Sequence, residues 1–194
     1  TTIQVLARVL AGEPTVVTDA PSPRAVLRAV WAAAPLPFRR TLSFALGMKP
    51  STQRGFQLLF HASSDGELQT LMRDAALVRL TWDAPPAGVT GPYQPWLEFV
   101  RHHLEHGNEQ LVGALTEELD GEYTPELLAR AAQLATDGAS VATLDIEALE
   151  RLQTKWDSVT PTAHVERELL GKLRLLIAER LAALHVAQTA TAGA

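Results

Sequence analysis

Between residues 83 and 92 the spacing of apolar side chains changes, and this change constrains the fold more than any other feature of the chain. The segment reads DAPPAGVTGP, with three prolines and two glycines, a composition typical of a boundary between folded parts. Upstream, short strand-like runs alternate with helical patterns, whereas downstream the apolar residues recur with a helical period. The sequence therefore predicts an α/β domain in residues 1–85, a linker in 86–92, a helical domain in 93–187 and a disordered tail in 188–194.

The upstream part predicts the strand and helix order β-α-β-β-α-β, preceded by one helix. Each strand–helix–strand unit is expected to be a parallel crossover. The step between the two middle strands is open: a hairpin there gives a ferredoxin-like sheet, and a parallel connection gives a small three-layer sheet. The predicted helices are 2–11, 23–34 and 67–75, and the predicted strands are 14–18, 41–46, 56–61 and 77–82.

The downstream part predicts an all-α region of about five helices. The longest has an apolar stripe broader than a coiled-coil seam, so part of it is a candidate interface. The predicted helices are 93–106, 109–119, 125–135, 145–157 and 161–186.

Charge and composition exclude several classes of function. Residues 1–85 carry 9 Lys and Arg against 6 Asp and Glu, whereas residues 86–194 carry 8 against 16, and the whole chain has a net charge of −5. An acidic half argues against nucleic acid as a partner. The chain has no cysteine, which excludes disulfides, thiolate zinc sites and iron–sulfur clusters, and no apolar run is long enough to cross a membrane. We expect no cofactor.

The amino-terminal end suggests that the chain is a processed protein or a piece of a longer one. The chain begins with Thr1 instead of methionine and continues at once into a helical pattern. A signal peptide has a basic stretch followed by an apolar stretch, and the amino-terminal residues of this sequence do not show that pattern.

Two adjacent arginines, Arg39 and Arg40, follow a break formed by Pro35 and Pro37 and precede a predicted strand. A guanidinium pair at such a place suits a carboxylate on a protein partner, or a phosphate. The simpler interpretation is a solvated edge of the sheet. We expect a protein partner at Arg39 and Arg40 before a nucleotide.

A histidine-rich helix end is the sharpest candidate for a metal site. Glu98, His102 and His106 are spaced by four residues, which places all three on one helical face. Two histidines at this spacing can bind one metal, with the carboxylate as a third ligand. The zinc-protease arrangement HExxH is absent. The alternative is a solvated helix end whose histidines suit the helix dipole.

Polar residues at the predicted strand ends are explained by local structure. Ser63, Ser64 and Asp65 follow a strand and precede a helix, where α/β sheets bind ligands, but capping accounts for them. Asp19 follows the first strand and suits a turn. No phosphate-binding loop occurs, and no nucleophile elbow surrounds Ser43.

Two stretches, Val9–Val17 (VLAGEPTVV) and Val30–Phe44 (VWAAAPLPFRRTLSF), resemble the middle domain of GTPase-associated protein 1-like proteins. These are large bacterial proteins of predicted conflict systems, encoded beside GTPases, and the resemblance spans about residues 5–83. It implies a cytoplasmic, non-enzymatic module that works through protein partners, among them a GTPase or another part of a larger complex. It transfers no catalytic residues.

The sequence thus predicts a protein-interaction or scaffold module, because no catalytic constellation is recognisable. The alternative is a metal-dependent or small-molecule enzyme that uses His102 and His106 or the carboxyl ends of the strands.

Overall fold

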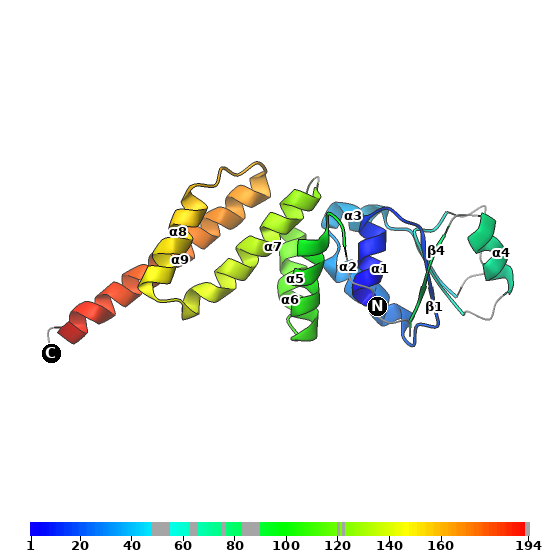
Figure 1. The fold of residues 1–194 in the computed structure, drawn as a ribbon, viewed down its shortest axis with the longest axis horizontal. Coiled ribbons are helices and arrows are strands. Elements are labelled where there is room, and N and C mark those ends of the chain that lie inside the picture. The colour runs from blue at the N-terminus through cyan, green and yellow to red at the C-terminus, as the bar shows by residue number, and fades with distance from the viewer. Residues whose placement is uncertain are drawn as a thin grey trace. The chain divides into compact units, whose positions relative to one another are not determined.

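A computed structural model describes residues 1–47, 55–62, 66–74, 77–82, 90–119, 121 and 123–192 of the 194-residue chain (Figure 1). The chain divides into two compact units, Thr1–Tyr123 and Thr124–Ala194. The first combines a four-stranded sheet with helices, and the second is helical. The expected combination of an α/β part with a helical part is confirmed.

The sheet of the first unit is parallel throughout and has the strand order β2-β3-β1-β4. The central strand pair aligns Val16 with Leu59, and the next pair aligns Leu59 with Ala45. Because β2 and β3 run in the same direction, no hairpin joins them, so the ferredoxin-like alternative is wrong and the parallel one is confirmed. The strands are β1 (Thr15–Thr18), β2 (Phe44–Leu46), β3 (Leu58–His61) and β4 (Val78–Thr81).

Helices cover both faces of this sheet. Val16, Ala45 and Leu59 point to one face, where Leu68 of α4 (Gly66–Asp74) completes a buried cluster. Alternate residues along a strand point the other way, so Val17 faces the side of α1 (Thr2–Leu10) and α2 (Pro23–Ala33). Figure 1 shows α4 on one side of the sheet and α1 and α2 on the other. The arrangement is the three-layer form.

A short helix, α3 (Leu36–Thr41), precedes β2 and includes the first residue of the predicted strand 41–46. The predicted break at the prolines is present, because α2 ends at Ala33. Pro35 then caps the next helix and Pro37 lies in its first turn, where the fixed φ of proline is tolerated. The Arg39 backbone N–H donates to the Pro35 carbonyl at 3.1 Å, and the Phe38 side chain of this helix is buried. Strand β2 is therefore only Phe44–Leu46, and the two arginines are helical.

Helices α5 (Gln94–Glu105) and α6 (Glu109–Glu118) belong to the first unit. They pack on α1 and α2 respectively. Trp96 of α5 is fully buried, and its indole N–H donates to the Ala33 carbonyl at 3.2 Å. The compact units thus divide at Tyr123, well beyond the predicted linker 86–92, of which residues 86–89 lie outside the described residues.

The second unit is a set of helices around one apolar core. Helix α7 runs to Ser140, five residues past its predicted end at residue 135. In this added stretch Asp137 accepts a hydrogen bond from the Trp156 indole at 2.8 Å. A β-carbon at Gly138 would lie 3.9 Å from Leu173 Cδ1, so helix α9 packs closely there. The helices are α7 (Pro125–Ser140), a 3₁₀ turn η1 (Val141–Thr143), α8 (Ile146–Asp157) and α9 (His164–Ala192).

The long helix α9 differs from its prediction at both ends. It begins at His164 instead of Pro161, and it continues through residues 188–192, which were expected to be disordered. Alanines are frequent in this last stretch and favour the helix. Among the described helices, none combines the length and the apolar character needed to span a membrane.

Candidate functional site

An apolar hollow lies in the first unit, between α2, α3, β2 and α6. We name it the aromatic groove. Its volume is about 460 Å³, which is in the range of pockets that hold small molecules or anchor side chains. Its lining consists of Leu27, Arg28, Trp31 and Ala32 on α2, Arg39 on α3, Phe44 on β2, and Gly113 and Glu117 on α6.

Two aromatic side chains form the apolar wall of the aromatic groove. Trp31 and Phe44 meet edge to face, with ring centroids 6.4 Å apart and an interplanar angle of 80°. Each remains 39% exposed. The neighbouring Val30 is fully buried, so Trp31 lies at the edge of the buried face of α2.

Arg39 lines the aromatic groove and closes the carboxyl end of α2. Its Nε donates to the Ala34 carbonyl at 2.7 Å, and its Nη2 donates to the Ala32 carbonyl at 3.2 Å and to the Thr116 hydroxyl. The Thr116 hydroxyl in turn lies 2.9 Å from the Ala32 carbonyl. The last carbonyls of a helix lack partners within the helix, so these side chains supply what a capping glycine supplies elsewhere.

The charge on Arg39 is held in a partly buried setting. Burial lowers the pKa of the Arg39 guanidinium from its usual value, and the nearby carboxylate of Glu117 partly offsets this effect. Arg39 therefore serves the architecture of α2, α3 and α6, while its neighbour Arg40 is exposed on α3. Of the predicted arginine pair, only Arg39 lines the groove.

The histidine cluster lies at the end of α5. The rings of His102 and His106 are close, with centroids 4.3 Å apart, and both side chains are exposed. Glu98 accepts a hydrogen bond from Gln94 at 2.8 Å. Within the described part of the chain, no three His, Asp or Glu side chains form a group suited to a metal ion. The structure thus brings together His102 and His106 but not the predicted set of three.

His103, between these two in sequence, was not singled out and is buried. It is 7% exposed, and its ring meets the Phe99 ring edge-on with centroids 4.4 Å apart. Its Nδ1 has no hydrogen-bond partner among the described residues. Burial lowers the pKa of His103, and electrostatic repulsion from the neighbouring His102 and His106 rings lowers it further. The ring therefore packs as a neutral, largely apolar group.

A smaller hollow of about 270 Å³ lies at the carboxyl ends of β1 and β3. The chain leaves β1 toward the α2 face and leaves β3 toward the α4 face, and such a switch point is where open α/β sheets bind ligands. Asp19 and His61 line it, and the Asp19 N–H donates to the His61 carbonyl at 3.2 Å. Asp19 has a φ of 61°, in the left-handed region. Residues 63–65, predicted to cap the following helix, lie outside the described residues.

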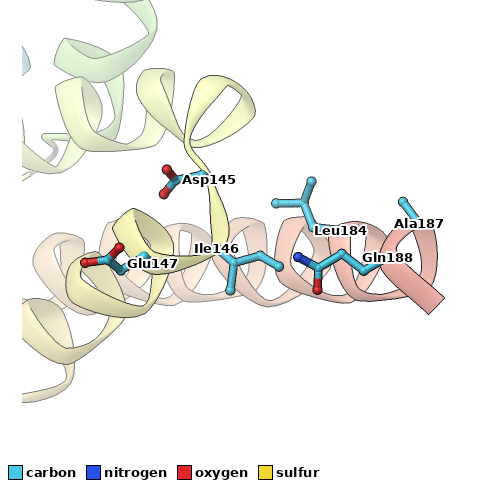
Figure 2. Close-up of a pocket in the computed structure, with 6 residues that line it drawn as sticks. All are labelled: Asp145, Ile146, Glu147, Leu184, Ala187 and Gln188. Carbon is cyan, nitrogen blue, oxygen red and sulfur yellow. The ribbon is translucent and has the colours of Figure 1, made fainter. Parts of the chain in front are cut away.

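The second unit has its own shallow hollow of about 410 Å³, between the start of α8 and the last turns of α9 (Figure 2). Ile146 and Leu184 supply its apolar surface. Asp145 at its edge is occupied in capping α8, because it accepts a hydrogen bond from the Ala148 N–H at 2.8 Å. The other carboxylate in its lining, Glu147, pairs with Arg151 at 2.8 Å. The packing of α8 and α9 therefore accounts for this hollow.

Comparison of the chain with protein-family models, with curated proteins and with solved structures found no match. The fold and the surfaces described above are therefore the grounds for a functional proposal.

Proposed function

We propose that this chain is a protein-interaction module that binds an apolar anchor side chain of a partner protein in the aromatic groove. The observation that carries the proposal is the pair Trp31 and Phe44, each 39% exposed on the wall of a cavity of about 460 Å³. Exposed aromatic groups beside a hollow are characteristic of interaction sites, and tryptophan is among the residues that contribute most to binding energy.

The construction of the groove favours binding with little loss of conformational freedom. Arg39 links the end of α2 to α6 through Thr116, so the groove's walls are joined by hydrogen bonds before any partner arrives. Preformed sites lose less entropy on binding. Arg28 and Glu117 supply charges of both signs beside the apolar wall, an arrangement similar to the polar rim of interfaces.

The resemblance of residues 5–83 to the middle domain of GTPase-associated protein 1-like proteins extends this proposal. It suggests that the partner belongs to a GTPase-linked bacterial conflict system and that the module acts as a scaffold in the cytoplasm.

Quantitative pull-down experiments test the proposal. The variant with Trp31→Ala and Phe44→Ala is compared with wild type, and the matched control carries Leu175→Ala and Leu176→Ala, two exposed leucines of α9. We expect the groove variant to lose the captured partner by roughly 30-fold in affinity, since truncating two anchor residues costs about 2 kcal/mol or more. The control should bind as wild type, with unchanged circular dichroism in both variants. Equal binding by wild type and groove variant contradicts the proposal.

A second candidate function is small-molecule binding at the carboxyl ends of β1 and β3. Its support is the hollow at the switch point, where Asp19 and His61 lie together. A carboxylate beside an imidazole suits a polar ligand that donates hydrogen bonds. Thermal-shift measurements with nucleosides and sugars test this candidate: a stabilisation that Asp19→Asn abolishes supports it, and no shift with any of these ligands contradicts it.

A further inference from the structure

His102 and His106, at the end of α5, hold their rings close together on the surface of the helix. His102 is in the last turn of α5 and His106 is its capping residue, so one helical turn separates them. Their ring centroids are 4.3 Å apart with planes inclined by 36°. Both side chains are exposed, so a solute can reach the pair from solvent.

A backbone hydrogen bond fixes the tautomer of one ring. The Nδ1 of His106 lies 2.7 Å from the His102 carbonyl oxygen and must donate to it, because a carbonyl only accepts. In the neutral form of this ring, the Nε2 of His106 then carries the lone pair that a metal needs. Histidines that ligate metals usually donate their other ring N–H to a carbonyl or carboxylate in this way.

The separation of the rings fits two ligands on one metal. With a metal–nitrogen bond of about 2.0–2.1 Å, the centroid of a bound imidazole lies roughly 3.2 Å from the metal. For a metal bonded in line to one nitrogen of each ring, two centroids 4.3 Å apart subtend an angle near 85°. That angle is close to the 90° between neighbouring ligands of a square-planar ion, which is the geometry of Cu²⁺ and Ni²⁺.

From this geometry we propose that His102 and His106 form a two-histidine binding site for a divalent transition metal, with Cu²⁺ bound most tightly and Ni²⁺ and Zn²⁺ more weakly. This order follows the general affinities of nitrogen ligands for these ions. Since no third His, Asp or Glu joins the pair among the described residues, water occupies the other positions on the metal.

His103 positions one of the two ligands. Its ring is held against Phe99 and meets the His102 ring edge-on, with centroids 5.2 Å apart. Because His103 is buried, it does not reach a metal bound at the surface. This site uses no residue of the aromatic groove, so it stands or fails independently of the proposed interaction function.

Isothermal titration of the purified chain with CuCl₂, NiCl₂ and ZnCl₂, in a buffer that does not bind metals, tests the site. We expect one Cu²⁺ per chain, and an affinity at least about tenfold lower in His102→Gln and in His106→Gln, because each variant loses the advantage of two linked ligands. The matched control is His164→Gln, an exposed histidine of α9, which should bind as wild type.

Electron paramagnetic resonance of the Cu²⁺-loaded chain gives a second readout. Two equatorial nitrogens are expected in wild type and one in either glutamine variant. Wild-type affinity in both His102→Gln and His106→Gln, a single nitrogen in the wild-type spectrum, or no binding of Cu²⁺ would overturn the proposal.

Discussion

At the scale of single residues, Arg39 shows how a polar side chain acquires its role from distant parts of the chain. Its sequence neighbours indicate only a charged pair after a proline break. The structure places three backbone and side-chain acceptors around its guanidinium, from α2 and from Thr116 of α6. This role was not predictable from the sequence, since it depends on where α6 packs. Arg40, one residue along, is exposed.

Replacing Arg39 should therefore destabilise the first unit much more than replacing Arg40. Arg39→Met leaves the Ala34 carbonyl without its donor and should lower the free energy of unfolding by about 1.5–3 kcal/mol, the usual range for hydrogen bonds to a charged group. Arg40→Met should stay within about 0.5 kcal/mol of wild type. Urea unfolding of both variants measures the difference, and equal stabilities would refute the structural role of Arg39.

His103 predicts a particular dependence of stability on pH. Its pKa is lowered in the folded chain, first by burial and then by His102 and His106. As the pH falls below about 6.5, His103 binds a proton in the unfolded chain but remains neutral in the folded chain. The free energy of unfolding therefore declines. The stability difference between pH 7.5 and pH 5.5 should shrink in His103→Phe and not in His164→Gln. An unchanged difference in His103→Phe argues against this assignment.

At the scale of elements, the start of α9 depends on one buried carboxylate. Glu166 is 2% exposed, accepts from the Thr162 N–H at 2.6 Å and from the Thr162 hydroxyl at 2.9 Å, and pairs with Arg130 at 2.7 Å. Burial alone raises the pKa of Glu166, but these hydrogen bonds and the Arg130 charge outweigh it, so the pKa is lowered overall. The arrangement caps α9 and joins it to α7.

Removing the Glu166 carboxylate should lower the free energy of unfolding of the second unit. Glu166→Ala should cost about 2–3 kcal/mol at neutral pH, whereas Glu168→Ala, on the exposed side of the same turn, should cost no more than about 0.5 kcal/mol. A lowered carboxyl pKa contributes stability above the unfolded value near 4.3 and loses it as the pH falls. The gap between wild type and Glu166→Ala should therefore narrow from pH 7 to pH 3, and a constant gap contradicts the role of the charge.

The strands were easier to predict than their pairing. The four runs of strand residues and their order along the chain were visible because β-branched and aromatic residues are enriched in them. Their parallel direction and the order β2-β3-β1-β4 depend on contacts between residues far apart in sequence, such as Val16 with Leu59. Helix α3 was not predicted because two prolines suggest a break, although Pro37 is tolerated in a first helical turn and Pro35 precedes it as the cap.

One of the candidate sites was predictable from the sequence and the other was not. The spacing of His102 and His106 on one helical face was readable from the sequence and is present in the structure. The aromatic groove was not foreseen, because Trp31 and Phe44 come from different elements and meet only after α2 and β2 pack. Surfaces built from several elements leave no local pattern.

At the scale of the whole molecule, each compact unit has a core of its own. In the second unit this core includes Leu149, Trp156 and Ile177, all almost fully buried. Leu149→Ala should cost about 2–5 kcal/mol in this unit. Hydrogen exchange should then accelerate in residues 124–192 and remain unchanged in α1 and α2. Equal acceleration in both units would mean that they unfold as one.

The central claim is that the aromatic groove is the surface through which this chain binds a partner protein. Photo-crosslinking tests it most directly, with p-benzoylphenylalanine placed at position 44 in one variant and at position 175 of α9 in the control. We predict a discrete adduct with a partner protein from position 44, lost when Trp31→Ala is added, and no such adduct from position 175. The claim is contradicted if position 44 gives no adduct, or if both positions give the same one.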